Sequence, residues 1–233
     1  MGPDDLRVRE QHAFVFAALE HRKRVLEVGC GAGQLARRLA ADGCTVTALD
    51  RELRDRSGSV TFVERDFLAF DAAPFEAVVF TASLHHISPL GDAAAHARKL
   101  VAPGGVVIAD EFDIASPDRE TLRWYYETQE LLAAAGVYDA TRIDAPDVAD
   151  PVARWQAGHE PHLHTGQEMR QALAALGTFS AAPAPYLYRY ICGGLPATDT
   201  GGSIPAHVLA TEQARIREGS LVAVGVRITV MVG

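Results

Sequence analysis

Short apolar runs alternate with helix-forming stretches through the first half of the chain. The apolar runs are rich in Val, Leu and Ala and end near glycine or aspartate, as strands buried on both faces often do. They predict strands at residues 24–29, 45–50, 60–63, 77–81 and 105–110. Helical spacing or helix-favouring composition predicts helices at residues 4–21, 34–41 and 92–101. This alternation predicts an α/β fold built on a mostly parallel sheet.

The pattern changes after residue 112. A helical stretch at residues 119–135 is followed by a proline-containing loop instead of a strand, and we interpret residues 112–165 as a helical lid inserted after the fifth strand. The remaining elements that we predict are helices at residues 166–176 and 207–217 and strands at residues 186–191 and 221–232. A chain of 233 residues favours one domain over residues 1–233, with an N-terminal helix within residues 1–22.

The net charge narrows the classes of partner, and the cysteine content indicates the cellular compartment. Thirty acidic residues against 22 basic ones give a net charge of −8, which repels phosphate backbones and anionic membrane surfaces. We therefore expect neither a nucleic acid nor a membrane as partner. The three cysteines form no CxxC pair and the first residues lack a signal-peptide pattern, so we expect a cytoplasmic protein. Nothing in the sequence indicates the oligomeric state.

A glycine-rich turn joins the first strand to the next helix. The segment Val25-Leu-Glu-Val-Gly-Cys-Gly-Ala-Gly33 carries glycine at positions 29, 31 and 33. Because glycine has no side chain, a ligand can lie against this backbone and meet the amides of the helix N-terminus. The turn therefore predicts a site for a nucleotide-like cofactor.

Two cofactors are compatible with this turn. Gly31-Ala-Gly-Gln-Leu-Ala36 fits the dinucleotide fingerprint, and Asp50 suits the ribose hydroxyls of either NAD or an adenosyl sulfonium. Glu27 is more informative, because a buried carboxylate beside the loop attracts an amino-acid ammonium and repels a pyrophosphate.

The glycine segment resembles motif I of the class I S-adenosylmethionine (SAM) dependent methyltransferases. Residues 60–67, 75–87 and 100–110 resemble the ends of the third, fourth and fifth strands of the same family, so the resemblance covers about residues 24–111. It implies a Rossmann-like sheet with an antiparallel C-terminal strand. It also implies methyl transfer from SAM, with S-adenosylhomocysteine (SAH) as the product.

By position, the resemblance implies cofactor contacts near the strand ends. Gly29, Gly31 and Gly33 would lie against the methionine portion of SAM, Asp50 would bind the ribose, Arg51, Asp66 and Phe67 would contact the adenine, and Thr81 or Ala82 would face the substrate. Glu27 would face the ammonium group. The chain departs from the family in residues 53–59 and 68–74, which leave little room for helices after the second and third strands.

Candidate catalytic residues follow the fourth and fifth strands. Methyl transfer is an in-line displacement, so a base helps only when the acceptor must lose a proton. His85 and His86 follow the fourth strand and Glu111 the fifth, where ligands bind in open α/β sheets, and Asp113 is also near this rim. Capping of a turn is the structural alternative for the histidines, and an exposed loop position is the alternative for the acids. His12 is a more distant candidate to close the same pocket.

The predicted lid adds aromatic, histidine and arginine candidates. Its aromatic residues, which indicate either a flat or apolar acceptor or the core of the lid, are Trp124, Tyr125, Tyr126 and Trp155. His159, His162 and His164 lie close together, but Pro161 intervenes and no thiolate or carboxylate stands at metal-binding spacing, so we expect a lid loop and no metal. Candidates to pair with an acceptor carboxylate are Arg142, Arg154 and Arg189.

We therefore predict a SAM-dependent methyltransferase that acts on a small molecule. Oxygen is the first expectation for the acceptor atom, followed by nitrogen or carbon. One alternative is a nicotinamide-dependent oxidoreductase, although the chain lacks the Tyr-x-x-x-Lys pair. The other is a non-catalytic binding or regulatory subunit with the SAM-binding fold. No motif identifies the acceptor, which lid and loop shape determine.

Overall fold

The computed structural model describes residues 3–196 and 199–233. Its strands are β1 (Arg24–Val28), β2 (Thr45–Asp50), β3 (Thr61–Glu64), β4 (Phe75–Thr81), β5 (Val101–Phe112), β6 (Thr178–Ala184) and β7 (Gly225–Met231). Its α-helices are α1 (Pro3–Leu19), α2 (Gln34–Ala41), α3 (Leu90–Leu100), α4 (Arg119–Ala134), α5 (Pro151–Ala157), α6 (Gly166–Ala174), α7 (Leu187–Gly193) and α8 (Asp199–Arg217). Short 3₁₀ helices are η1 (Phe67–Ala69), η2 (Leu84–His86) and η3 (Ala140–Arg142).

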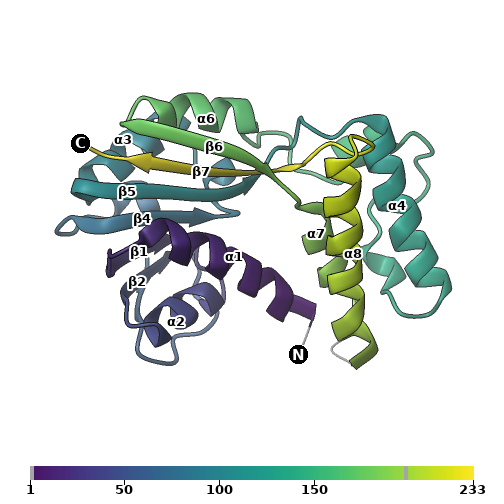
Figure 1. The fold of residues 1–233 in the computed structure, drawn as a ribbon, viewed down its shortest axis with the longest axis horizontal. Helices are drawn as coiled ribbons and strands as arrows, with labels where there is room; N and C mark the ends of the chain where they lie inside the picture. The colour runs from purple at the N-terminus through teal and green to yellow at the C-terminus, as the bar shows by residue number, and fades with distance from the viewer. Residues whose placement is uncertain (1–2, 197–198) are drawn as a thin grey trace. The chain divides into compact units, whose positions relative to one another are not determined.

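The strands of the described residues form a seven-stranded sheet in the order β3-β2-β1-β4-β5-β7-β6 (Figure 1). Strands β1 to β5 are parallel to their neighbours in this order. Strand β7 runs antiparallel to β5, because Gly104 N donates to Val232 O at 2.8 Å near one end and Asp113 N donates to Val224 O at 2.7 Å near the other. The predicted mostly parallel sheet with an antiparallel C-terminal strand is confirmed.

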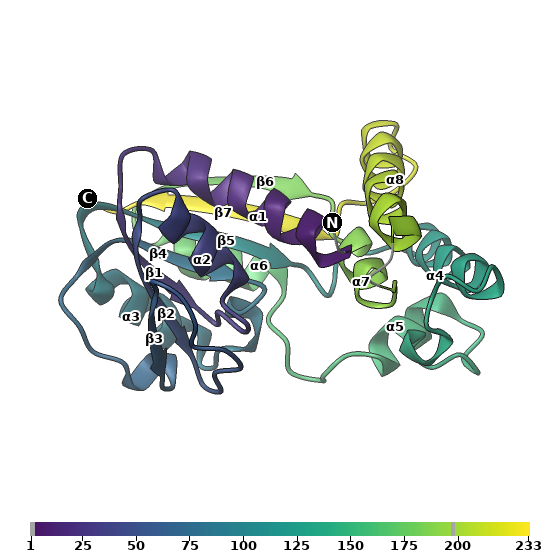
Figure 2. The same cartoon turned by 90° about the horizontal axis from the view of Figure 1, so that it is seen from below.

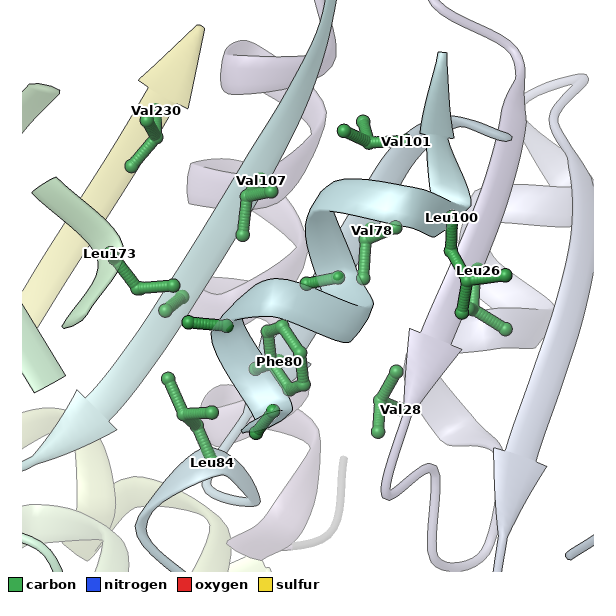
Figure 3. Close-up of a cluster of buried hydrophobic side chains, with 14 of the residues drawn as sticks. Leu26, Val28, Val78, Phe80, Leu84, Leu100, Val101, Val107, Leu173 and Val230 are labelled. Carbon is green, nitrogen blue, oxygen red and sulfur yellow. The ribbon is translucent and has the colours of Figure 1, made fainter. Parts of the chain in front are cut away.

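Helices cover both faces of the sheet. Successive strand residues point to opposite faces. Leu26, Val28 and Phe80 share one hydrophobic cluster with residues of α3 and α6 (Figure 3). On the other face, Val25 and Ile108 share a cluster with residues of α1 and α2, two helices that lie beside each other (Figures 1 and 2). With both faces covered, the strand ends remain as the place where a ligand can reach the sheet.

The chain divides into two compact units. The sheet unit comprises residues 10–112, 164–182 and 226–233. The helical unit comprises residues 1–9, 113–163 and 183–225. The segment predicted as a lid supplies α4, η3 and α5 of the helical unit, and α7 and α8 from later in the chain belong to the same unit. Among the described helices, none has the length and apolar composition needed to cross a membrane.

One predicted strand is wrong. Residues 186–191 were expected to be extended, but the strand lies earlier, at β6, and Leu187–Gly193 form α7. The buried carboxylate of Glu212 on α8 accepts hydrogen bonds from the amides of Tyr186, Leu187 and Tyr188 at 2.7 to 3.0 Å. This distant carboxylate satisfies the first N–H groups of α7, which otherwise lack partners in a helix.

Candidate functional site

A cavity of about 410 Å³ lies in the sheet unit, at the carboxyl ends of β1, β2 and β4. Open α/β sheets bind ligands at this end, in the crevice where the strand order reverses. The cavity is lined by Val28, Gly29, Leu49, Asp50, Arg51, Arg65, Asp66, Phe67, Leu68, Ala82, Ser83, His86, Ile87 and Ser88. The structure thus brings together seven of the predicted site residues: Gly29, Asp50, Arg51, Asp66, Phe67, Ala82 and His86.

Gly29 and Gly31 shape the loop after β1 in different ways. Both have left-handed φ angles, 73° and 53°, which cost other residues roughly 1–2 kcal/mol. A Cβ on Gly29 would lie 2.4 Å from the Cβ of Ser83, whereas a Cβ on Gly31 would meet no atom of the described residues within 4 Å apart from its chain neighbours. Packing therefore requires glycine at position 29, and position 31 leaves space beside the loop.

Asp50 ends β2 and reaches the glycine loop. Its Oδ2 accepts a hydrogen bond from the backbone N–H of Gly31 at 2.7 Å, and its Oδ1 accepts one from Glu52 at 3.1 Å. A carboxylate offers about four acceptor sites, so these two bonds leave capacity for ligand hydroxyls. Asp50 can therefore hold the loop and bind a ribose at the same time.

Asp66 and Phe67 form the wall near η1. The Oδ1 of Asp66 accepts a hydrogen bond from Leu68 N at 2.9 Å and so caps η1. Arg51 Nε lies 3.6 Å from Asp66 Oδ2, but both side chains are at least half exposed, so this ion pair adds little stability. Phe67 packs edge-on against Phe80 at 5.4 Å and also lines the cavity. Phe67 is thus part of the core and of the cavity wall.

Two acidic residues, Glu27 and Asp50, bring negative charge close to the glycine loop. The pKa of the Cys30 thiol is raised to about 12, mainly by burial and then by the negative charges of Glu27 and Asp50. The same charges disfavour any further anion at the loop and favour a cation. An ammonium or a sulfonium therefore suits this loop better than a pyrophosphate does.

Several predicted cofactor residues do not line the cavity: Glu27, Gly31, Gly33 and Thr81. Glu27 and Thr81 are buried within β1 and β4. At Gly33, the place of a Cβ is taken by the ring of Phe62, 2.6 Å away. Packing against Phe62 therefore accounts for the glycine at position 33.

Half of the lining residues were not predicted from the sequence: Val28, Leu49, Arg65, Leu68, Ser83, Ile87 and Ser88. Most of these residues are next in the sequence to a predicted site residue. Proximity to a predicted motif is therefore the signal that could have identified them. Ser83 has a clear structural role, because its Oγ donates to Val28 O at 2.6 Å and its Cβ lies against Gly29. Ser83 therefore joins the turn after β4 to the glycine loop.

Glu111 and His85 form a buried pair beside the cavity. Glu111 lies within β5 and is 0% exposed, so it is not an exposed loop acid. Its Oε1 accepts hydrogen bonds from Ser83 N and Leu84 N at 2.9 and 2.8 Å, and its Oε2 lies 2.5 Å from His85 Nδ1. An ionised Glu111 only accepts hydrogen bonds, and in that state Nδ1–H of His85 is the donor to Oε2. The exposed ring of His86, which lines the cavity, packs against His85 at 4.1 Å.

Two other candidates near the sheet have different surroundings. The Nε2 atom of His12 lies 2.6 Å from Oδ2 of Asp42, at the end of α2, and His12 does not line the cavity. Asp113 belongs to the helical unit, where its Oδ1 accepts a hydrogen bond from Ala115 N at 3.1 Å.

Most aromatic candidates lie in the core of the helical unit. Tyr125, Tyr126 and Trp155 are 2%, 4% and 3% exposed. Trp155 Nε1 also donates to Ile114 O at 2.9 Å. The interpretation as lid core therefore accounts for these three residues, while the half-buried Trp124 lines a groove between α4 and α8.

The histidine and arginine candidates are dispersed. His159 Nδ1 lies 2.8 Å from Trp155 O in the helical unit, while His164 belongs to the sheet unit. No group of three metal-binding side chains occurs in the part of the chain that the structure describes. Arg154 pairs with Glu130 at 2.8 Å, and Arg189 packs over the ring of Tyr186.

Comparison with known proteins identifies the family of the chain. A family model described as a methyltransferase domain matches residues 4–177. The chain is 27% identical over 173 residues to a ubiquinone biosynthesis O-methyltransferase of Methylocella silvestris, which covers 60% of this chain and 68% of that protein. It is 36% identical over 98 residues to an uncharacterized methyltransferase of Mycobacterium tuberculosis, which covers 38% of this chain and half of that protein.

A solved structure shares the fold. The N-methyltransferase NodS of Bradyrhizobium japonicum, crystallised with SAH, matches with a TM-score of 0.52 and 17% identity, over 96% of this chain and 86% of that one. The family model covers most of the chain and includes the glycine loop, Asp50, Asp66 and the turn after β4. The chain therefore belongs to the methyltransferase domain family, and it is a class I SAM-dependent methyltransferase.

Proposed function

We propose that this methyltransferase transfers the methyl group of SAM to an oxygen atom of a small-molecule acceptor, with nitrogen or carbon as the next candidates. The observation that carries the proposal is the cavity at the strand ends, whose lining brings Gly29, Asp50 and Asp66 together with His86. The similarity to an O-methyltransferase of ubiquinone biosynthesis supports oxygen. Membership of the methyltransferase family decides against the nicotinamide-dependent oxidoreductase.

The residues at the loop fit SAM. The negative charges of Glu27 and Asp50 suit the ammonium and sulfonium groups of the cofactor, and the open space at Gly31 allows close approach to the backbone. Asp50 would bind the ribose hydroxyls, and Asp66 and Phe67 the adenine. SAM supplies an electrophilic methyl group on a positively charged sulfur. The protein must therefore mainly align the acceptor and exclude water.

His86 is the proposed proton acceptor, because its ring lines the cavity. A hydroxyl acceptor would lose its proton to a ring nitrogen of His86 as the new oxygen–carbon bond forms. His85 and Glu111 would act as positioning residues, since Glu111 orients the ring of His85 and that ring packs against His86. Because the lid segment begins at Phe112, the last residue of β5 and the one next to Glu111, we retain residues 112–165 as the proposed determinant of acceptor choice.

Calorimetry and product analysis test the proposal. The purified chain should bind SAM and SAH, and incubation with SAM and a panel of phenols, alcohols and amines should yield a product with one added methyl group on oxygen. Methylation only on nitrogen or carbon would contradict the oxygen assignment. Full turnover by His86→Ala between about pH 6 and pH 8, where an unperturbed histidine titrates, would show that His86 is not the base.

A further inference from the structure

His164 is the first residue of the chain segment that returns to the sheet unit. Its backbone N–H donates to His85 O at 3.0 Å. Its side-chain Nε2 lies 3.1 Å from Ile87 O and 2.9 Å from Ser88 Oγ. One residue therefore makes three contacts with residues 82–88, which we call the β4 turn.

The contact with Ile87 determines where His164 carries its proton. A carbonyl oxygen only accepts hydrogen bonds, so Nε2 must hold a proton to bond with it. The same N–H then lies between Ile87 O and Ser88 Oγ as a shared donor. Both the neutral Nε2–H form and the imidazolium can make this bond, so the contact does not depend on the charge of the ring.

His164 is itself held in place by the helix that follows it. Thr165 caps α6, because its N–H donates to Glu168 Oε2 at 2.8 Å and its Oγ1 accepts from Glu168 N at 3.2 Å. This reciprocal capping fixes the start of the helix. Helix α6 in turn buries Met169 and Leu173 in the hydrophobic cluster of the sheet. Figure 3 shows Leu173 in this cluster. His164 therefore connects the β4 turn to a packed element.

The β4 turn is held by hydrogen bonds with two residues outside it, Glu111 and His164. Glu111 on β5 accepts hydrogen bonds from its first residues, and His164 bonds to its later ones. His86, Ile87 and Ser88 of this turn line the cavity. We propose that His164 is a positioning residue of the methyltransferase, which holds the β4 turn in the conformation that the cofactor site requires. This inference rests on the proposed function, since it takes the cavity as the cofactor site.

Two measurements on the full chain test this role. Hydrogen–deuterium exchange of the β4 turn reports how firmly the turn is held, and calorimetry with SAH reports the affinity of the cavity. The variants are His164→Ala, which removes the side-chain bonds, and His164→Gln, whose amide N–H can reach the position of Nε2. His162→Ala is the matched control, because His162 is an exposed histidine two residues earlier.

We expect His164→Ala to speed exchange in the β4 turn and to weaken SAH binding about three- to tenfold, as the loss of a hydrogen bond predicts. His164→Gln should restore both values to near wild type, and His162→Ala should change neither. A folded His164→Ala variant with wild-type SAH affinity would overturn the inference. So would a folded His164→Gln variant whose turn exchanges fast and whose affinity is low, even where His164→Ala is too unstable to purify.

The wild-type chain separates this inference from the proposed function. If it binds neither SAM nor SAH, the proposed function and the cofactor role of His164 both fail. The exchange measurement still decides whether His164 holds the turn.

Discussion

The carboxylate of Glu111 lies 2.5 Å from Nδ1 of His85, and both side chains are buried. Through its other oxygen, the same carboxylate accepts hydrogen bonds from the amides of Ser83 and Leu84 in the β4 turn. Hydrogen bonds to a buried charged group are worth more than those between neutral groups, and leaving one unmade costs the full desolvation of its partner. This pair therefore contributes both to stability and to the orientation of the histidines.

Glu111→Gln should destabilise the protein by about 1–3 kcal/mol and lower methyl transfer. Glutamine can still accept from the turn amides, but its NH₂ group would face the Nδ1 proton of His85. Urea unfolding and turnover measure the two effects. The exposed Glu127→Gln on α4 is the control, and equal stability of the two variants would contradict the role of Glu111.

Asp50→Ala should weaken SAH affinity by about 1–3 kcal/mol, because the ligand loses a charge-assisted acceptor. The substitution also removes the partner of the Gly31 amide, which loosens the loop. Calorimetry measures the affinity. Asp71→Ala, at an exposed aspartate, should bind as wild type does. Unchanged affinity in Asp50→Ala would mean that another residue binds the ribose.

Alanine at three glycines with left-handed φ angles should separate packing from ligand approach. Gly43→Ala adds only backbone strain, about 1–2 kcal/mol, since a Cβ there meets no atom of the described residues within 4 Å apart from its chain neighbours. Gly29→Ala should cost clearly more, because its Cβ would overlap Ser83. Gly31→Ala should lower the free energy of unfolding by about as much as Gly43→Ala does, but it should also bind SAH more weakly. Normal SAH affinity in Gly31→Ala, or equal unfolding of all three variants, would contradict the arrangement of the loop.

Cys30 should resist alkylation at about pH 8. Its pKa is raised to about 12, mainly by burial and then by Glu27 and Asp50, so the reactive thiolate is scarce in the folded protein. A free thiol has a pKa of about 8.5. Mass spectrometry after iodoacetamide treatment measures the rate, with the urea-unfolded chain as the reference. Labelling of Cys30 at the same rate in both states would show that its environment is not as described.

Glu212 should make the helical unit relatively more stable in acid. Burial raises the pKa of Glu212 above its ordinary value of 4.5, even though three backbone amides bond to it. The folded state then binds this proton more tightly than the unfolded state does. The resulting stabilisation is complete below about pH 4.5 and is lost as pH rises through the folded-state pKa.

The difference in unfolding free energy between wild type and Glu212→Gln isolates this effect, since glutamine does not titrate. The advantage of the wild type should be largest in acid and should shrink toward neutral pH. A difference that grows with rising pH would mean that the amide bonds lower the pKa of Glu212 more than burial raises it.

The parts of the site that lie within one local motif could be predicted from sequence. The glycine loop, Asp50 and Asp66 stand at strand ends, and strand ends are marked by apolar runs that stop at glycine or aspartate. The contacts of Ser83 with Gly29 and of His164 with Ile87 join residues far apart in the chain, so no spacing reveals them. Glu111 was ambiguous for the same reason, because only the tertiary structure shows that β5 continues past it.

The error at residues 186–191 has a similar cause. Tyr and Ile favour strands, so the local composition predicted an extended segment. The carboxylate that caps α7 comes from Glu212 on another helix. A cap supplied by a distant residue overrides local propensity and leaves no trace in the segment that it stabilises.

The two positions where the chain leaves and re-enters the sheet unit have a consequence for engineering. Glu111 stands just before the departure and His164 at the return, and both are hydrogen-bonded to the same β4 turn. A chimaera that takes the intervening segment from a relative should therefore place its junctions after Glu111 and before His164, so that both residues are retained. Junctions placed outside them would exchange the supports of the turn together with the specificity segment, and a loss of activity would then be uninterpretable.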